Sequence, residues 1–459
     1  MYWVNFLHIY QPPNQKPYWI KKIADESYRK LTKGFLANPS AKATININAV
    51  LAELFEKNGC QDIISDLKTL ALRGQIEFTS SGKYHPFFPL LPKEEIIRQI
   101  KLNDETNKKY FGEAYRPKGF FPPEMGYNLK VAQIAKKLGF EWIIIDELGF
   151  SPETGQMNHQ TIYDIEGLTD LNVFFREREM SFRILSAEVF SPKMITDLFA
   201  KKFTANDYVI TAMDGETFGH HRPGLEEVLF EVYKEPSIQS VQLSDLSSLF
   251  SKHEKVLPRD SSWALMMKDI ERNVPFSRWF DPENPIQAMQ WDLANLAIKT
   301  VKRLTREDSA WPQVRDELDR AIHSDQFWWA SAKPWWSLEM IERGAKELKD
   351  VIEHCPVSKK GEIKRAKEWY AQILFMGFEW QRSGKVEEIS RSNDEDVIAR
   401  ITAEMPYIPE TEFNGIVSNL QHQMESSSKN LEFERAAQLR DRIKELEGKR
   451  NEITRQQTI

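Results

Sequence analysis

The sequence predicts an α/β protein with a parallel sheet, either open or closed into a barrel, followed by a mainly helical region and a C-terminal helical hairpin. Three observations support this prediction. Up to about residue 260, short β-like runs alternate with amphipathic helical stretches, which is typical of parallel βα units. From 261 to 405 the strand signals fade while helical periodicity continues. Beyond a segment with two prolines and a glycine, residues 416–450 are highly charged and periodic.

The first region is expected to alternate strands and helices along the chain. Strands are predicted at 4–8, 75–79, 119–121, 142–146 and 208–213. Helices are predicted at 43–57, 62–73, 93–111, 129–138 and 192–202, and in the second region at 286–305, 314–325, 337–353 and 361–383. The expected domains are an α/β domain over 1–260, a helical domain over 261–405, a linker over 406–415 and a helical hairpin over 416–450.

Composition excludes several classes of protein. With 62 basic and 68 acidic side chains the net charge is −6, which gives no general attraction to nucleic acid or to an anionic membrane. No apolar run approaches the roughly 20 residues needed to span a bilayer. The two cysteines, Cys60 and Cys355, suit a reducing compartment, and the N-terminal residues lack the pattern of a signal peptide. We therefore expect a cytoplasmic protein.

Two segments place ionisable residues at the end of a predicted strand. In the first, 119–127, apolar residues lead into a double proline and then Glu124. Prolines cannot donate ladder hydrogen bonds, which fits a strand terminus. In the second, 208–221, a mostly apolar run delivers Asp214 and Glu216 to a glycine-containing loop. In a barrel of parallel strands, catalytic groups belong at such carboxyl ends.

Paired carboxyls at two strand ends suit the cleavage of glycosidic bonds. One group protonates the departing oxygen, and the other attacks the sugar or activates water. The structural alternative is that each carboxylate caps its strand or forms half of a salt bridge, which is a common role for a single acidic residue. The pairing of two such segments favours the catalytic interpretation.

At these positions the chain resembles glycoside hydrolase family 57 through four ordered motifs. The first is LHIYQPP (7–13), where Tyr10 stands in place of the second histidine of many relatives. The second is GQIEFTSSGKYHPFFPLL (74–91). The third and fourth are GFFPPEMGY (119–127) and YVITAMDGETFGHH (208–221). Together these motifs are far more specific than any one of them.

The resemblance covers roughly residues 1–400 and implies a (β/α)7 barrel, followed by a helical domain that completes the active-site cleft. It implies a retaining α-glycosidase acting on α-glucans by hydrolysis or transglycosylation, such as an α-amylase or 4-α-glucanotransferase. Glu124 would be the nucleophile and Asp214 the general acid/base. Retention requires the two carboxyls to lie about 5–5.5 Å apart, and the acid catalyst requires a raised pKa.

Other residues of these motifs, and of the aromatic-rich stretch 324–337, are candidates for sugar binding. The predicted substrate-binding residues are His8, Gln11, Glu77, His85, Glu216, His220, Asp325, Trp328, Trp329 and Trp336. The structural alternative is that individual histidines are satisfied core side chains and that some tryptophans belong to the core, because adjacent helical positions do not share a face.

No cofactor or metal is expected, because the family's mechanism needs none. Two other functions remain open from the sequence. One is a metal-dependent polysaccharide deacetylase, since Asp214, Glu216, His220 and His221 are the ligand types of a zinc or manganese site. The other is a catalytically idle glucan-binding scaffold. The intact Glu124 and Asp214 argue against the scaffold.

The C-terminal segment resembles a second known module. NLEFERAAQLRDRIKELE (430–447) is similar to the UVR motif, a helical hairpin of excision-repair and protease-adaptor proteins. The resemblance implies a protein partner or self-association through 416–450. The structural alternative is a charged tail that folds back on its own enzyme. Neither interpretation implies nucleic-acid binding, because the rest of the chain carries no basic-groove signature.

Overall fold

This computed structural model describes residues 1–186, 189, 191–393, 410–429, 433–448 and 450. The α/β domain begins with strand β1 (Tyr2–Ile9). This strand pairs in parallel with β2 (Ala43–Ile47) on one side and with β8 (Tyr208–Asp214) on the other. These strands are buried almost throughout, which is typical of a parallel sheet covered on both faces.

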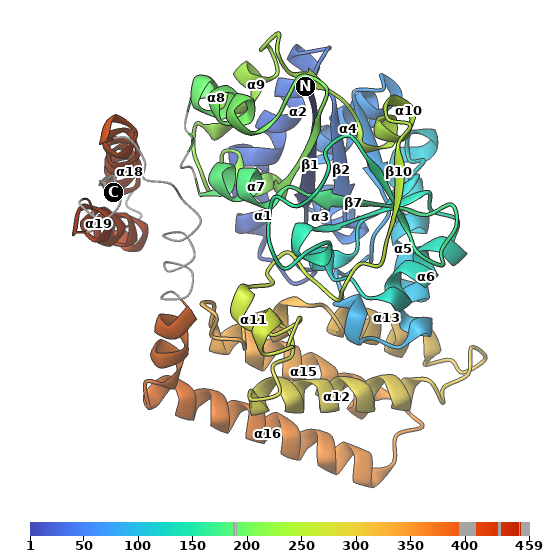
Figure 1. The fold of residues 1–459 in the computed structure, drawn as a ribbon. Helices are drawn as coiled ribbons and strands as arrows, with labels where there is room; N and C mark the ends of the chain where they lie inside the picture. Colours follow the sequence, from blue (N-terminus) through green and yellow to red (C-terminus); the bar gives the residue numbers. More distant parts are fainter. Residues whose placement is uncertain (187–188, 190, 394–409, 430–432, 449, 451–459) are drawn as a thin grey trace.

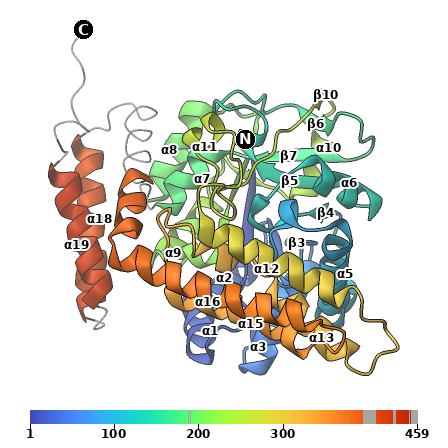
Figure 2. The same ribbon diagram turned by 90° about the horizontal axis from the view of Figure 1, so that it is seen from below.

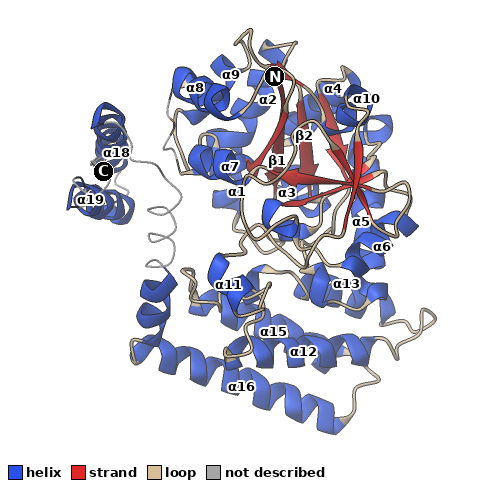
Figure 3. Ribbon diagram, viewed as in Figure 1, coloured by secondary structure: helices blue, strands red, loops and turns tan. Residues whose placement is uncertain are grey.

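The sheet closes into a barrel. β2 pairs in parallel with β3 (Ile76–Thr79), and a parallel bridge from Ser80 to Phe120 connects β3 to β4 (Gly119–Phe120). The sheet continues in parallel through β5 (Trp142–Asp146) to β7 (Asn172–Arg176). The Glu177 N–H donates to the Ile210 carbonyl at 2.7 Å and joins β7 to β8. Within the described residues, seven strands thus form a ring in the order β1-β2-β3-β4-β5-β7-β8, which confirms the (β/α)7 barrel. Figure 3 shows the strands in red with helices around them.

Alternate strand residues fill the barrel interior. Val4, Phe6, Ile210, Ala212 and Ile144 share one core cluster, whereas their chain neighbours pack outward against helices. This division follows the two-residue period of a strand. A Cβ at position 119 would lie 2.1 Å from the Trp142 ring, so only glycine fits where β4 passes this side chain.

Helices cover the barrel (Figure 1). They are α1 (Pro17–Ile23), α2 (Arg29–Ala37), α3 (Ala49–Lys57), α4 (Gln61–Leu72), α5 (Lys93–Phe111), α6 (Leu129–Lys137), α7 (Arg178–Leu185), α8 (Pro192–Lys202), α9 (Leu225–Val232) and α10 (Leu246–Leu249). The short strands β6 (Ile162–Ile165), β9 (Gln239–Ser240) and β10 (His253–Val256) lie outside the ring. The single helix predicted at 43–57 is wrong at its start, because residues 43–47 form β2.

The helical domain packs across one end of the barrel (Figures 1 and 2). It contains α11 (Met267–Glu271), α12 (Pro285–Val301), α13 (Trp311–Ala321), α14 (Asp325–Trp328), α15 (Leu338–His354) and α16 (Lys360–Arg382). One hydrophobic cluster includes Phe120 and Ile143 of the barrel together with Trp279 and Leu318 of the helices. A bidentate contact of Arg98 with Asp319 adds a polar link between the two domains. The barrel and the helical domain therefore share a core.

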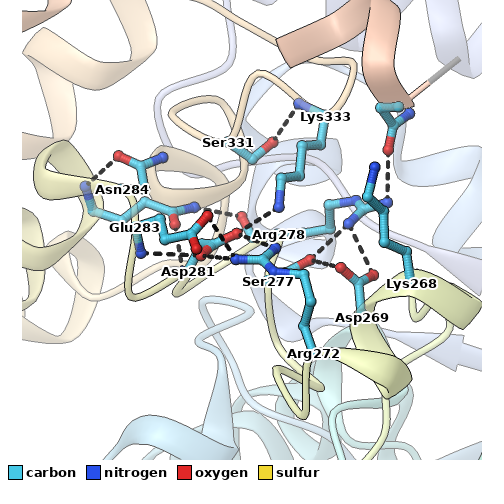
Figure 4. A network of polar contacts seen from close by, with 12 residues as sticks. Lys268, Asp269, Arg272, Ser277, Arg278, Asp281, Glu283, Asn284, Ser331 and Lys333 are labelled. Atoms are coloured by element: carbon cyan, nitrogen blue, oxygen red, sulfur yellow. Dashed lines mark hydrogen bonds and ion pairs between the residues drawn. The ribbon is translucent and has the colours of Figure 1, made fainter.

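A polar network joins the segment around α11 to the last described residues of the helical domain (Figure 4). Arg278 donates to Asp269 at 3.0 Å and to Asn393 at 2.9 Å, and Lys268 donates to Ser392 at 3.2 Å. The last described residues before position 394 are thereby held against the segment that begins with α11.

The C-terminal hairpin consists of α18 (Glu410–Lys429) and α19 (Phe433–Gly448), which lie side by side (Figures 1 and 2). Residues 410–415, expected to be linker, are helical, and 406–409 lie outside the described residues. Phe413 and Val417 are buried, and the Arg450 guanidinium lies 4.8 Å from the centre of the Phe413 ring. In the described residues, no helix is long and apolar enough to cross a membrane.

Candidate active site

Glu124 follows the shortest strand of the barrel. β4 ends at Phe120, Pro122 and Pro123 follow, and Glu124 has a φ of 63°. This left-handed conformation is uncommon for a residue with a side chain. It brings Glu124 to the barrel end at which the strands finish, and its side chain remains only 14% exposed.

Trp263 holds Glu124 by two hydrogen bonds. Its indole Nε1 donates to Glu124 Oε2 at 2.6 Å, and its backbone N–H donates to the Glu124 carbonyl at 3.0 Å. Glu124 Oε1 lies 3.7 Å from His85 Nδ1. One carboxylate oxygen is thus fixed from the segment that follows the barrel, and the other faces a histidine.

The pKa of Glu124 is strongly raised. Burial is the largest cause, followed by the negative charges of Asp214 and Asp325, and together they raise the pKa to about 8. The hydrogen bonds from Trp263 and Ser324 oppose this increase, because they favour the ionised form.

Asp214 is the last residue of β8, and it is in register with His8 on β1. Burial raises its pKa to about 6, while the positive charge of Arg176 at the end of β7 acts in the opposite direction. The raised pKa agrees with the expectation for Asp214, but it remains below that of Glu124. The difference arises because Asp214 faces a cation and Glu124 faces two anions.

Glu216 is a third carboxyl at this barrel end. It accepts hydrogen bonds from Gln11 Nε2 at 2.9 Å and from the Tyr28 hydroxyl. Burial and the charge of Asp214 raise its pKa to about 8, and the two donors limit the increase. Gln11, predicted to bind substrate, thus donates a hydrogen bond to the side chain of Glu216.

The region after the barrel contributes Asp325. Its Oδ2 accepts from the Tyr10 hydroxyl at 2.7 Å and lies 3.0 Å from His323 Nδ1. Burial alone would raise the pKa of Asp325, but the hydrogen bond and charge of His323 outweigh it and lower the pKa. Burial disfavours the imidazolium of His323, yet its contacts with Asp325 and Glu347 raise its pKa to about 9. Asp325 is therefore ionised and His323 protonated at neutral pH.

His8 and His85 form a stacked wall beside these carboxyls. The His85 ring lies 4.1 Å from the Tyr10 ring and 5.0 Å from the His8 ring. His8 Nδ1 is 2.7 Å from Asn46 Oδ1, and burial lowers the pKa of both histidines, that of His85 to about 4. Both rings are neutral at pH 7. Among the described residues, the buried His85 Nε2 has no hydrogen-bond partner, so it can bind a ligand hydroxyl.

Comparison with known proteins agrees with this arrangement of strand-end carboxyls. The model of glycosyl hydrolase family 57 matches residues 6–257. The chain belongs to this family. A second model, the UvrB/uvrC motif, matches residues 415–449.

Family 57 relatives are distant in sequence. Alpha-amylase 1 of Dictyoglomus thermophilum is 24% identical over 260 residues, which cover 55% of this chain and 37% of that protein. The 4-alpha-glucanotransferase of Thermococcus litoralis is 25% identical over 363 residues, which cover 71% of this chain and 54% of that protein. This chain therefore spans about a third to a half of the length of these relatives. The solved GH57 branching enzyme of Thermococcus kodakaraensis shares the fold, with a TM-score of 0.61 at 16% identity over 80% of this chain and 94% of that one.

Several predicted site residues lie outside the family 57 carboxyl cluster. Glu77 is near the start of β3, where it accepts from Thr44 at 2.8 Å and from the Ser244 N–H at 3.0 Å. Since catalytic groups lie at the ends of the strands, the structure does not bring Glu77 to the site. His220 lies 2.6 Å from Glu26 on the rim.

The three predicted tryptophans are all partly buried, and they differ in what they contact. Trp328 packs 5.3 Å from the core residue Trp279, and Trp336 stacks on Trp380 at 5.8 Å. Trp329 is partly exposed and lies edge-on to Trp335, which is 50% exposed. Of the three predicted residues, Trp329 is the one that contacts an exposed aromatic ring.

Four residues near the carboxyls were not predicted: Trp263, Tyr28, Arg176 and His323. Arg176 ends β7 as Asp214 ends β8, so a strand assignment at 172–176 would have found it. Trp263, Tyr28 and His323 carry no comparable signal in the sequence. Among the described residues, no group of three or more His, Cys, Asp or Glu side chains is arranged to hold a metal ion.

Proposed function

We propose that this protein is a retaining α-glycosidase that acts on α-glucans by hydrolysis or transglycosylation. The observation that supports it most strongly is the pairing of Glu124 and Asp214. Both are buried at the ends of barrel strands, and the charge of Asp214 raises the pKa of Glu124. Retaining and inverting glycosidases both use two such carboxyls, and membership of family 57 supports the retaining assignment. The named family 57 relatives, an alpha-amylase and a 4-alpha-glucanotransferase, support α-glucan as the substrate class.

In the proposed mechanism Glu124 attacks the anomeric carbon and forms a glycosyl-enzyme, while Asp214 protonates the departing glycosidic oxygen. Asp214 then removes a proton from water, which gives hydrolysis, or from a sugar hydroxyl, which gives transfer. Trp263 orients the nucleophile through Oε2. The neutral His85 could accept a hydrogen bond from a sugar hydroxyl or donate one to it, and the ionised Asp325 could accept one.

The proton on the carboxyl pair determines the productive state. In this mechanism Glu124 must be ionised and Asp214 protonated, but the pair holds its proton mainly on Glu124, because its pKa is about 8 and that of Asp214 is about 6. Between these values the pair carries one proton, and we propose that the productive arrangement is the minor one. The expected profile of kcat/KM is a bell with limbs near pH 6 and pH 8.

Product analysis with maltoheptaose tests the proposal. Purified wild type, Glu124→Ala and Asp214→Ala are incubated with the oligosaccharide, with and without EDTA. We expect shorter products from the wild type, none from either variant, and no effect of EDTA. Additional longer products would indicate transfer. An unchanged substrate with the wild type would refute the α-1,4-glucan assignment, and loss of activity in EDTA would point to the metal-dependent alternative.

We further propose a cytoplasmic location and a protein-docking role for the hairpin. Both cysteines are buried free thiols, which suits a reducing compartment. The UvrB/uvrC motif match and the 64% exposed Phe433 support a protein contact through α18 and α19. Capture of a partner by the wild type but not by Phe433→Gln would support the docking role, and equal capture by both would contradict it.

A further inference from the structure

The outer face of α16 carries an uncovered aromatic pair. Phe375 is 65% exposed and Phe378 is 60% exposed, one helical turn apart. The inner face of the same helix, with Ala366, Ile373 and Gly377, is buried. Figure 1 shows α16 at the edge of the molecule farthest from the barrel. Large exposed apolar side chains grouped on one face are typical of an interaction surface.

The residues that flank this pair follow helical spacing. Glu368, Ala371 and Arg382 lie seven before, four before and seven after Phe375, and all are exposed. Positions separated by seven residues, about two helical turns, share a face. We call this face, made of Glu368, Ala371, Phe375, Phe378 and Arg382, the α16 stripe.

The charges of the α16 stripe are arranged symmetrically about Phe375. The acid Glu368 lies about 10.5 Å along the axis on one side, and the base Arg382 lies at the same distance on the other. A two-fold axis through Phe375 would place an antiparallel copy of the helix with Arg382 opposite Glu368, twice. The same operation would put Phe378 of each copy near Ala371 of the other, where the small side chain leaves room for a ring.

We propose that the α16 stripe is a self-association surface through which two copies of this chain pair with antiparallel α16 helices. A self-complementary patch that carries both partners of each ion pair is what an isologous dimer requires. The ion pairs within the helix, Lys364 with Glu368 at 3.8 Å and Arg382 with Glu379, join exposed side chains. Such exposed pairs contribute little to stability and can be exchanged for contacts between copies.

Sedimentation equilibrium of the full chain over about a hundredfold range of concentration tests the proposal. We expect a reversible monomer–dimer equilibrium for the wild type. Phe375→Gln should raise the dissociation constant at least about tenfold, because it removes the aromatic anchor at the axis. Leu72→Gln is the matched control, because Leu72 is 64% exposed on α4 and lies outside the stripe. Circular dichroism checks that each variant folds.

A charge exchange gives the sharper test. Glu368→Arg and Arg382→Glu should each weaken the dimer severalfold, and the double variant should restore the wild-type constant to within about threefold. A wild type that is monomeric at every concentration overturns the proposal, as does a double variant as weak as the single ones. Dissociation by Phe433→Gln but not by Phe375→Gln would assign the association to the hairpin and overturn it as well.

Discussion

The two carboxyls of the site are supported by different regions of the molecule. Glu124 takes its hydrogen bond from Trp263, beyond the last barrel strand, whereas Asp214 is balanced by Arg176, which ends β7. The surroundings of Asp214 are thus supplied by the barrel, whereas those of Glu124 depend on the segment that follows the barrel. The difference teaches that the two carboxyls, although they interact through their charges, take their other partners from different regions of the chain.

The largest effect is expected at the nucleophile. Glu124→Gln should lower kcat by on the order of 10⁴-fold or more, because a neutral amide is a far weaker nucleophile than a carboxylate. Turnover of maltoheptaose measures this loss. If the variant kept most of its activity, Glu124 would not be the nucleophile.

The same variant is expected to change how stability depends on pH. Glu124 has a pKa raised from 4.5 to about 8 in the folded protein, so the folded state binds the proton more tightly. The free energy of unfolding of the wild type therefore falls as pH rises through this window, and Glu124→Gln avoids that fall. Thermal unfolding at pH 4.5 and pH 8 should show a variant more stable than wild type by several degrees at pH 8 only. An equal difference at both pH values would contradict the raised pKa.

Trp263→Phe sharpens the comparison on the nucleophile side. It removes the donor that favours ionised Glu124, so the pKa of Glu124 should rise further and kcat/KM should fall about 10- to 100-fold. Because Glu124 has the higher pKa of the pair, the limb near pH 8 should move upward. Movement of the limb near pH 6 would instead assign the higher pKa to Asp214.

Tyr28→Phe is the matched change on the barrel side. It removes the hydroxyl that donates to Glu216, so the pKa of Glu216 should rise from about 8. We expect only a severalfold loss in kcat/KM, because Gln11 still donates to the same oxygen. A loss as large as that of Trp263→Phe would show that both sides depend equally on a single donor.

The smallest effect is expected at Glu77, near the opposite end of the barrel. Glu77→Gln should change kcat/KM by less than about twofold and should lower the melting temperature, because Thr44 and the Ser244 N–H lose a charged acceptor. Parallel activity and unfolding measurements separate the two effects. A large loss of activity with unchanged stability would return Glu77 to the substrate site.

The sequence predicted the two catalytic candidates because each follows an apolar run that stops abruptly. It missed β2 because residues 43–47 precede α3 almost directly, and their apolar positions continue the helical period. Trp263 could not be predicted, because its role arises from the packing of a loop against Glu124 and not from any local pattern. Glu77 was predicted through its motif. The motif does not reveal that Glu77 lies near the start of β3, away from the strand ends that carry Glu124 and Asp214.

The left-handed backbone at Glu124 has a consequence for the design of trapped variants. A residue with a Cβ at a φ of 63° costs of order 1–3 kcal/mol, which glycine does not incur. If Glu124 is the nucleophile as proposed, its loop is less stable than a loop with glycine at this position would be, and an inactive variant is expected to be the more stable protein. Glu124→Gly relieves both the torsion and the burial of the carboxyl, so it is the variant of choice for soaking intact oligosaccharides into crystals.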